Sequence, residues 1–205
     1  MLAVQILIQL DIDKIFSGQA RDMVLKHLPC GGNRWVLRAD EPVYLYKTSY
    51  FWNRFATRCM KSRLSKDFGN YFVRSIEYWG IDLRSDELNF RKFSMAVNIT
   101  LKKPIGAQPY IYAVRTDMTA EMELSSWEYP VLFADDVCVL TGEYGDGGTG
   151  RRACTLWVKE SSLQSPPAHC DFLLLTMCST SAYNAYNNEH PYCDVYELPR
   201  TVKPR

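Results

Sequence analysis

The sequence predicts an all-β fold of eight antiparallel strands, with one helix before them and one after them. From Pro42 to Glu160, short runs alternate apolar and polar residues and are rich in Val, Ile, Thr and aromatic side chains, which strands favour. Segments with turn-forming chemistry, such as Gly145–Gly148, separate these runs. Short strands spaced in this regular way are typical of an up-and-down barrel or of a sandwich.

The eight predicted strands follow one another along a continuous stretch of the chain. They are Pro42–Phe51, Phe55–Leu64, Tyr71–Trp79, Asn89–Leu101, Tyr110–Thr116, Glu121–Trp127, Tyr129–Leu140 and Arg152–Glu160. No repeat, low-complexity tract or linker divides them, so the strands belong to a single domain.

Helical patterns flank the strands on both sides. Apolar residues recur at helical intervals over Asp11–Leu28, and a Pro-Cys-Gly-Gly segment ends that helix. A second helix is predicted over Ala168–Tyr186, because a Pro-Pro pair precedes it and proline is favourable at a helix start. We expect residues 1–34 to be an atypical secretory signal or an N-terminal helix, and residues 35–205 to form one domain.

The charge balance argues against a nucleic-acid partner, and the lengths of the apolar runs argue against a membrane span. The chain has 24 basic and 23 acidic residues among 205, a formal net charge of +1. Nucleic-acid-binding proteins usually carry a basic excess, so we expect no nucleic-acid partner. The longest apolar run, Phe172–Met177, is far shorter than the ~20 residues that span a bilayer, so we expect no membrane span.

The seven cysteines favour disulfides over a metal site. They are Cys30, Cys59, Cys138, Cys154, Cys170, Cys178 and Cys193. None has Cys-x-x-Cys spacing and the three histidines are scattered, whereas zinc ligands usually come in close pairs. Disulfides imply an oxidising compartment, so we expect a secreted, extracellular protein. Cys30 is the expected unpaired thiol, and Asn98 in Asn-Ile-Thr is a candidate glycosylation site.

No motif supports catalysis. The Gly-rich segment Gly145–Gly150 lacks the Lys-Ser or Lys-Thr of a phosphate-binding loop, and no Gly-x-Ser-x-Gly motif marks a nucleophile. Asp135 and Asp136 are adjacent, and adjacent strand residues point to opposite faces, so they do not form a shared-proton pair. We therefore expect a protein that is not an enzyme and needs neither a cofactor nor a metal.

One ordered set of residues resembles a known family. A Cys-Val-Leu segment at Cys138, a Thr-Leu-Trp segment at Thr155 and Cys170 have the order and spacing of a signature found in the histamine-binding lipocalins of tick saliva. That signature reads Cys-Asp-(Val/Ile/Leu), Glu-Leu-(Trp/Tyr) and Cys. The first strand, Pro42–Tyr50, is similar to the family's first strand, and the resemblance extends over residues 35–194.

The resemblance implies a specific architecture. The family has an eight-stranded up-and-down antiparallel lipocalin barrel around an internal ligand cavity, with an N-terminal and a C-terminal helix. Its usual bridges imply Cys59–Cys193 and Cys138–Cys170, and Cys154–Cys178 would be a third. A monomer is expected.

The chain departs from the family where the family binds amines. A buried ammonium needs a carboxylate, because an unpaired buried charge costs several kcal/mol. Four positions that align with the family's acids hold other residues: Asn53, Tyr129, Val139 and Thr155. The alternative is that Glu77, Asp82 or Glu123, which the resemblance does not align with a family acid, supplies the carboxylate and restores amine binding.

The aromatic part of the family's site is retained. Tyr50 and Trp157 keep their places, and Trp127 lies where the family has another aromatic residue. The predicted ligand-binding residues are Tyr50, Asn53, Trp127, Tyr129, Thr155 and Trp157. This set predicts an apolar, aromatic cavity with neutral hydrogen-bonding groups.

Three functions remain open on the sequence. The preferred one is a carrier that sequesters a sterol, fatty acid or eicosanoid and thereby modulates host inflammation or immunity. The second is a scavenger of histamine or serotonin that uses unaligned acids. The third is a module that binds a host protein or cell and acts on immunity or complement.

Overall fold

The computed structural model describes residues 35–49, 58–82, 89–116, 126–143, 152–178 and 182–197. The predicted N-terminal helix, Cys30, Tyr50 and Asn53 lie outside these residues. The division of the chain at residue 34 therefore stays a prediction.

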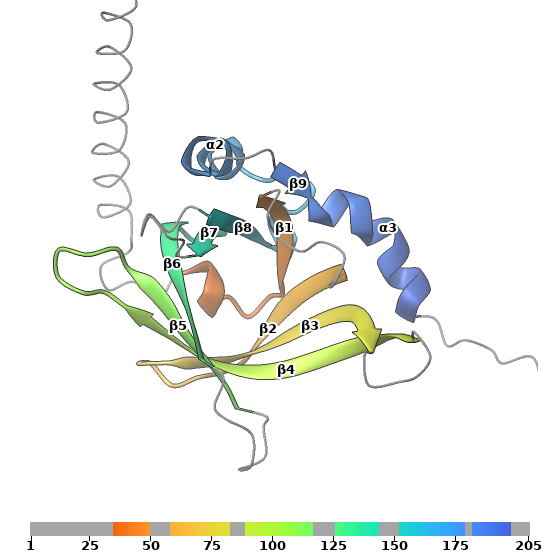
Figure 1. Ribbon diagram of the computed structural model, residues 1–205, viewed down its shortest axis with the longest axis horizontal. Helices are drawn as coiled ribbons and strands as arrows, with labels where there is room; N and C mark the ends of the chain where they lie inside the picture. Colours follow the sequence, from red (N-terminus) through yellow and green to blue (C-terminus); the bar gives the residue numbers. More distant parts are fainter. Residues whose placement is uncertain are drawn as a thin grey trace, which may run out of the picture.

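Eight antiparallel strands form a closed barrel (Figure 1). They are β1 (Val43–Ser49), β2 (Arg58–Asp67), β3 (Phe72–Asp82), β4 (Asn89–Lys102), β5 (Tyr110–Arg115), β6 (Ser126–Ala134), β7 (Cys138–Glu143) and β8 (Arg152–Lys159). Each strand pairs with the next, and β1 pairs with both β8 and β2, which closes the sheet. The predicted all-β barrel is confirmed, and the sandwich is wrong.

The helices lie outside the barrel (Figure 1). Helix α2 (Ala168–Met177) covers β7 and β8, and helix α3 (Ala185–Glu197) packs against β1 and β2. The single helix predicted over Ala168–Tyr186 is wrong, because a short strand, β9 (Ala182–Asn184), separates the two helices. Strand β9 pairs with the C-terminal half of β1 (Lys47–Ser49). The backbone hydrogen bonds to β1 stabilise this segment as a strand, so the helix does not continue through it.

The predicted seventh strand, Tyr129–Leu140, is also wrong. A turn at Asp135–Val137 divides it, so that its first part belongs to β6 and its last part to β7. The Asp135 carboxylate accepts hydrogen bonds from the backbone N–H groups of Val137 and Cys138, at 2.9 and 2.7 Å. This local hydrogen bonding competes with the strand and is why aspartate favours turns.

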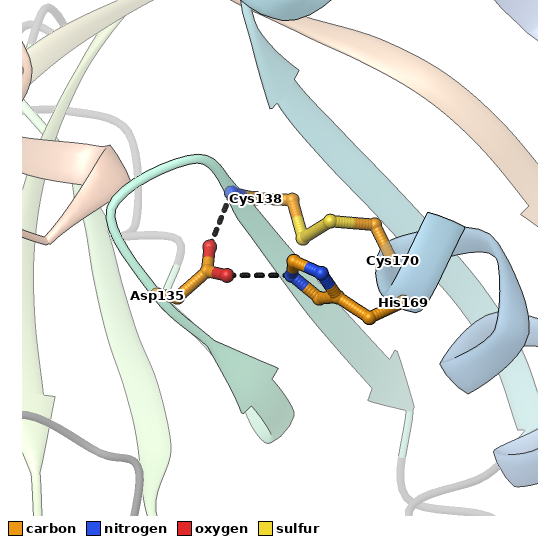
Figure 2. A group of neighbouring side chains, drawn as sticks. All are labelled: Asp135, Cys138, His169 and Cys170. Atoms are coloured by element: carbon orange, nitrogen blue, oxygen red, sulfur yellow. Dashed lines mark hydrogen bonds and ion pairs between the residues drawn. A yellow bond between two sulfur atoms is a disulfide. The ribbon is translucent and has the colours of Figure 1, made fainter. Parts of the chain in front are cut away.

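Three disulfides join the helices to the barrel, with the pairing that the resemblance implies. Cys138–Cys170 and Cys154–Cys178 fix α2 to β7 and β8, and Cys59–Cys193 fixes α3 to β2. Asp135 adds a hydrogen bond to His169 at the start of α2, 2.7 Å between Oδ2 and Nε2 (Figure 2). The two cysteines on β7 and β8 therefore point outward.

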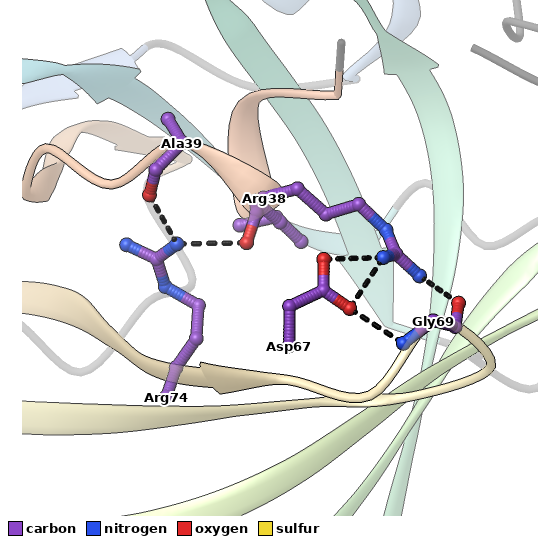
Figure 3. Close-up of polar contacts among 6 residues, drawn as sticks. Arg38, Ala39, Asp67, Gly69 and Arg74 are labelled. Atoms are coloured by element: carbon purple, nitrogen blue, oxygen red, sulfur yellow. Dashed lines mark hydrogen bonds and ion pairs between the residues drawn. The ribbon is translucent and has the colours of Figure 1, made fainter. Parts of the chain in front are cut away.

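One end of the barrel is closed by the 3-10 helix η1 (Val36–Arg38). The Trp35 ring meets the Phe72 ring edge to face, with centroids 6.0 Å apart. Arg74 of β3 is fully buried and donates to the carbonyl oxygens of Leu37 and Ala39, at 2.7 and 3.2 Å (Figure 3). The guanidinium thus ties η1 to the barrel wall.

A second arginine holds the outside of the same end. Arg38 of η1 binds the Asp67 carboxylate, 2.6 Å from Nη1 to Oδ1, and donates to the carbonyl of Gly69 (Figure 3). The N–H of Gly69 in turn donates to Asp67, and this bond, with the Arg38 pairing, lowers the pKa of that carboxyl. Gly69 has φ +85°, a left-handed conformation that glycine adopts without strain.

Candidate functional site

The outward cysteines define the inner wall of the barrel. Side chains alternate along a strand, so the neighbours of Cys138 and Cys154 face inward. Val139 and Thr141 on β7 lie opposite Trp157 and Thr155 on β8, and all four belong to this wall. Two of the predicted ligand residues, Thr155 and Trp157, therefore face the barrel interior side by side.

Hydrogen bonds link these inward side chains. The Trp157 indole N–H donates to the Thr155 hydroxyl at 3.0 Å, and that hydroxyl lies 2.7 Å from the Thr141 hydroxyl. Thr141 and Thr155 are both buried. Their mutual bond uses one of their two O–H donors, which leaves one donor for another acceptor.

The two predicted residues on β6 lie on the same wall. Val131 pairs with Thr141, so Tyr129 and Trp127, which alternate with it, also face inward. Burial, with a smaller contribution from Glu143, raises the pKa of the Tyr129 phenol. Trp127 is 37% exposed and lies at the start of β6, where the wall meets solvent. The wall thus combines three aromatic side chains with two buried hydroxyls.

The inner wall carries little negative charge. Val139, at the position of the family's signature acid, is 1% exposed and points inward. Among the described residues of β6, β7 and β8, Glu143 is the carboxylate on this face, and it is exposed at the end of β7. Glu77 lies on the outer face of β3 and pairs with Arg63 and Lys92, at 3.4 and 3.1 Å. The side chains of Asp82 and Glu123 lie outside the described residues.

Sequence reasoning missed Thr48 and Thr141. Strand β1 has an irregularity between Leu45 and Lys47, so both Leu45 and Thr48 face the interior, while simple alternation would put Lys47 there. Lys47 instead points outward and binds Asp171 of α2 at 2.8 Å. Thr48 pairs with Thr155 across the strands and is fully buried. The inward position of Thr141 could have been predicted from the sequence. The resemblance implies that Cys138 forms a disulfide to the following helix and so faces outward, and a residue three positions further along a strand faces the opposite side.

A cavity of about 60 Å³ lies at the side of the barrel, under α3. Strands β1 and β2 pair only at Val43–Ser62 and Tyr44–Lys61 within the described chain, and α3 covers the gap that opens beyond these pairs. The lining includes Tyr44, Tyr78, Trp79, Tyr186, Glu189 and His190. Ligand pockets usually enclose about 300–1,000 Å³, so this cavity has room for a few water molecules or for one end of a ligand.

Glu189 is the buried acid of this side cavity. It is 7% exposed, and its Oε2 accepts a hydrogen bond from the Cys59 backbone N–H at 2.8 Å. Burial raises the pKa of its carboxyl, and the Cys59 hydrogen bond and Arg58 oppose that shift. The contact fixes α3 beside its disulfide to β2.

A possible metal-binding group has another role. Asp135, Cys138, His169 and Cys170 place one donor atom each within 4.8 Å of one another (Figure 2). Both sulfurs are joined in the Cys138–Cys170 disulfide, and a disulfide sulfur is not the thiolate that a metal binds. Within the described chain, this group joins α2 to the turn between β6 and β7.

Asn98, the candidate glycosylation site, lies on the outer face of β4. It alternates with Val97 and Ile99, which are buried inside, and it is partly exposed. Sugar at this position stays a prediction. None of the described helices has the length and apolar character needed to cross a membrane.

Comparison with known proteins identifies the fold. No family model and no curated protein sequence matches the chain. Among solved structures, it is similar to Japanin from Rhipicephalus appendiculatus bound to cholesterol, with a TM-score of 0.53, 18% identity and coverage of 71% of this chain and 91% of Japanin. It is also similar to H1 crustacyanin from the lobster Homarus americanus, with a TM-score of 0.45, 14% identity and coverage of 83% and 91%. With its closed eight-stranded barrel and two flanking helices, the chain has the lipocalin fold.

Proposed function

We propose that the chain is a secreted carrier that binds an apolar or neutral small molecule inside its barrel and so removes a mediator from a host's tissue. The observation that carries this proposal is the inner wall of β6 to β8, where aromatic rings and hydroxyls stand in place of buried acids. Such a wall suits a sterol, a fatty acid or an eicosanoid, because apolar ligands gain most from burial against aromatic side chains.

Secretion and the ligand class have independent support. Three disulfides suit an oxidising compartment. The similar Japanin structure holds cholesterol, which is an apolar molecule with one neutral polar group. The action on host inflammation or immunity rests on the resemblance to tick salivary lipocalins.

The test is native mass spectrometry of protein expressed through a secretory pathway. We expect an adduct of a few hundred daltons that organic extraction removes, and the extracted protein should take up cholesterol or a fatty acid at one per chain. A Trp157→Ala variant should lose most of the adduct, while Tyr112→Ala, on the outer face of β5, should keep it. Extracted protein that takes up neither class of lipid would contradict the proposal.

Amine binding is the second candidate, and one observation favours it. Glu143 lies on the inner face next to Tyr129 and could meet an ammonium group. Because Glu143 is exposed, water weakens that attraction, and we expect histamine to bind weakly. If the protein takes up one histamine per chain in the same experiment, and Glu143→Gln abolishes this uptake, the protein is an amine scavenger and not a lipid carrier.

A further inference from the structure

The buried hydroxyl of Thr48 has no hydrogen-bond partner among the residues that the structure describes. Thr48 is fully buried, and its Oγ1 is one of four buried side-chain polar atoms without a partner in the described part of the chain. A buried hydroxyl without a partner costs about 1–3 kcal/mol, so native proteins keep few of them. This cost suggests that the hydroxyl is used by something other than the protein itself.

The position of Thr48 shows where its hydroxyl is directed. Thr48 lies opposite Thr155 across β1 and β8, and Thr155 lies opposite Thr141 across β8 and β7. Residues that are directly opposite in an antiparallel pair point to the same face. The three threonines therefore form a row of hydroxyls on the inner wall, next to the Trp157 ring.

The hydrogen-bond count of this row defines its ligand. The Thr155 hydroxyl accepts from the Trp157 N–H and shares a bond with Thr141, so this pair retains one unused O–H donor. Thr48 supplies a second unused donor. The side chains of β7 and β8 that face the interior beside the row, Val139 and Trp157, carry no positive charge. The buried Arg74 on β3 donates to Ser62 and Leu37, so a carboxylate at the row would lack a counter-charge beside it.

We propose that the row Thr48, Thr155 and Thr141 binds the carbonyl or hydroxyl oxygen of an otherwise apolar ligand. Two O–H donors match the two lone pairs of one such oxygen, and the apolar part of the ligand lies against the aromatic wall. The inference rests on the proposed carrier function. It narrows the ligand class from lipids in general to neutral lipids with an alcohol, ketone or ester group.

The test uses two probes of equal chain length, dodecan-2-one and dodecane, which displace a fluorescent naphthylamine from the whole secreted protein. We expect the wild type to bind the ketone at least 10-fold more tightly than the alkane. Thr48→Val should weaken ketone binding about 5- to 10-fold, the effect of one hydrogen bond, and leave the alkane unchanged. Thr48→Ser, which keeps the hydroxyl, should retain the wild-type affinity.

Ser49 provides the matched control. It is also buried and also has a hydroxyl without a partner, but it adjoins Thr48 on β1 and points to the outer face. Thr48→Val and Ser49→Ala should each raise the Tm, because each removes an unpaired buried hydroxyl, yet only Thr48→Val should weaken ketone binding. A purely structural role for Thr48 predicts the Tm change without the loss of affinity.

The outcomes separate this inference from the carrier function. Equal binding of ketone and alkane, or unchanged ketone binding by Thr48→Val, would overturn the hydroxyl row and leave the carrier function in place. Failure of both probes to bind, together with failure of cholesterol and fatty acid uptake, would overturn both.

Discussion

At the scale of single residues, Arg74 and Glu189 are buried ionisable groups in the described part of the chain, and they have different partners. Arg74 is held by hydrogen bonds alone: besides the η1 carbonyls, it donates to the hydroxyl and the carbonyl oxygen of Ser62, at 2.9 and 2.8 Å. Burial lowers the pKa of its guanidinium to about 10, so it remains charged at neutral pH. Its geometry depends on the planar fork of the guanidinium, which presents donors in several fixed directions.

Arg74→Lys should therefore destabilise the protein although it conserves the charge. One ammonium cannot reach Ser62 and both η1 carbonyls, and a buried carbonyl left unpaired costs about 1–3 kcal/mol. We expect the free energy of unfolding in urea to fall by about 2 kcal/mol. Arg63→Lys, at an exposed arginine of β2, is the control and should change it by less than about 0.5 kcal/mol. Equal effects of the two substitutions would contradict the role given to Arg74.

Glu189→Gln should stabilise the protein in a pH-dependent way. Burial raises the pKa of the Glu189 carboxyl above its value in the unfolded chain, so the acid favours folding at low pH and this contribution is lost as pH rises through the folded pKa. Glutamine keeps an acceptor for the Cys59 N–H and never ionises. The gain in Tm should therefore be larger at pH 8 than at pH 4.

The control for this measurement is the exposed Glu128 on β6. Glu128→Gln should leave the Tm nearly unchanged at both pH values, because its side chain is in water in both states. A Glu189→Gln variant that is less stable than the wild type at pH 8 would show that the negative charge itself holds α3.

At the scale of elements, α2 is held at several points. Two disulfides, at Cys170 and at the C-cap residue Cys178, connect α2 to the barrel. The Asp135–His169 hydrogen bond and the Lys47–Asp171 ion pair add to them. Phe172 and Leu175 on its outer face are each 63% exposed, so burial of this helix is one-sided. The covalent connections therefore contribute much of what holds α2 in place.

Removing one of these disulfides should cost stability without unfolding the barrel. Cys138 and Cys170 are 32 residues apart, and the chain-entropy estimate for a loop of that length is about 3–4 kcal/mol. We expect the Cys138→Ala/Cys170→Ala variant to lose about this much in urea unfolding and to keep its far-UV circular dichroism. The corresponding Cys154→Ala/Cys178→Ala variant, whose cysteines are 24 residues apart, should lose slightly less. A variant as stable as the wild type would refute the covalent role.

At the scale of the whole molecule, the barrel closes unevenly. Strands β3 and β4 pair over eleven residues in regular register, whereas β1 and β2 pair at two positions within the described chain. Helix α3, β9 and the Cys59–Cys193 disulfide cover the remaining length of that junction. We therefore predict that the barrel opens most easily at the β1–β2 junction.

The Cys59→Ala/Cys193→Ala variant should open this junction selectively. We expect amide hydrogen exchange at positions 59 and 60 of β2 to accelerate, because these residues lie beyond the β1–β2 pairs and in the irregular part of the β2–β3 register. Exchange in the paired segments of β3 and β4 is the internal control and should stay slow. Uniform acceleration across all strands would show that the disulfide stabilises the whole barrel and not this junction.

The sequence by itself determined the strand content, six of the eight strand positions to within a few residues, and the cysteine partners implied by the family resemblance. Strand periodicity and turn residues are local properties, so they can be read without the fold. The error at Tyr129–Leu140 arose because an aspartate turn interrupts an apolar run, and the error at Ala168–Tyr186 because β9 gains its stability from β1. Both depend on hydrogen bonds that a linear pattern does not show.

Only the tertiary structure decided which side chains share the barrel interior. Strand alternation placed Thr155 beside Trp157, but the irregularity in β1 turned Thr48 inward and Lys47 outward, against that alternation. The buried Arg74, the acid Glu189 under α3 and the row of threonines each depend on partners more than ten residues away. Contacts of this kind depend on the register between strands and on the closure of the barrel. Both are set only when all the strands of the sheet have paired.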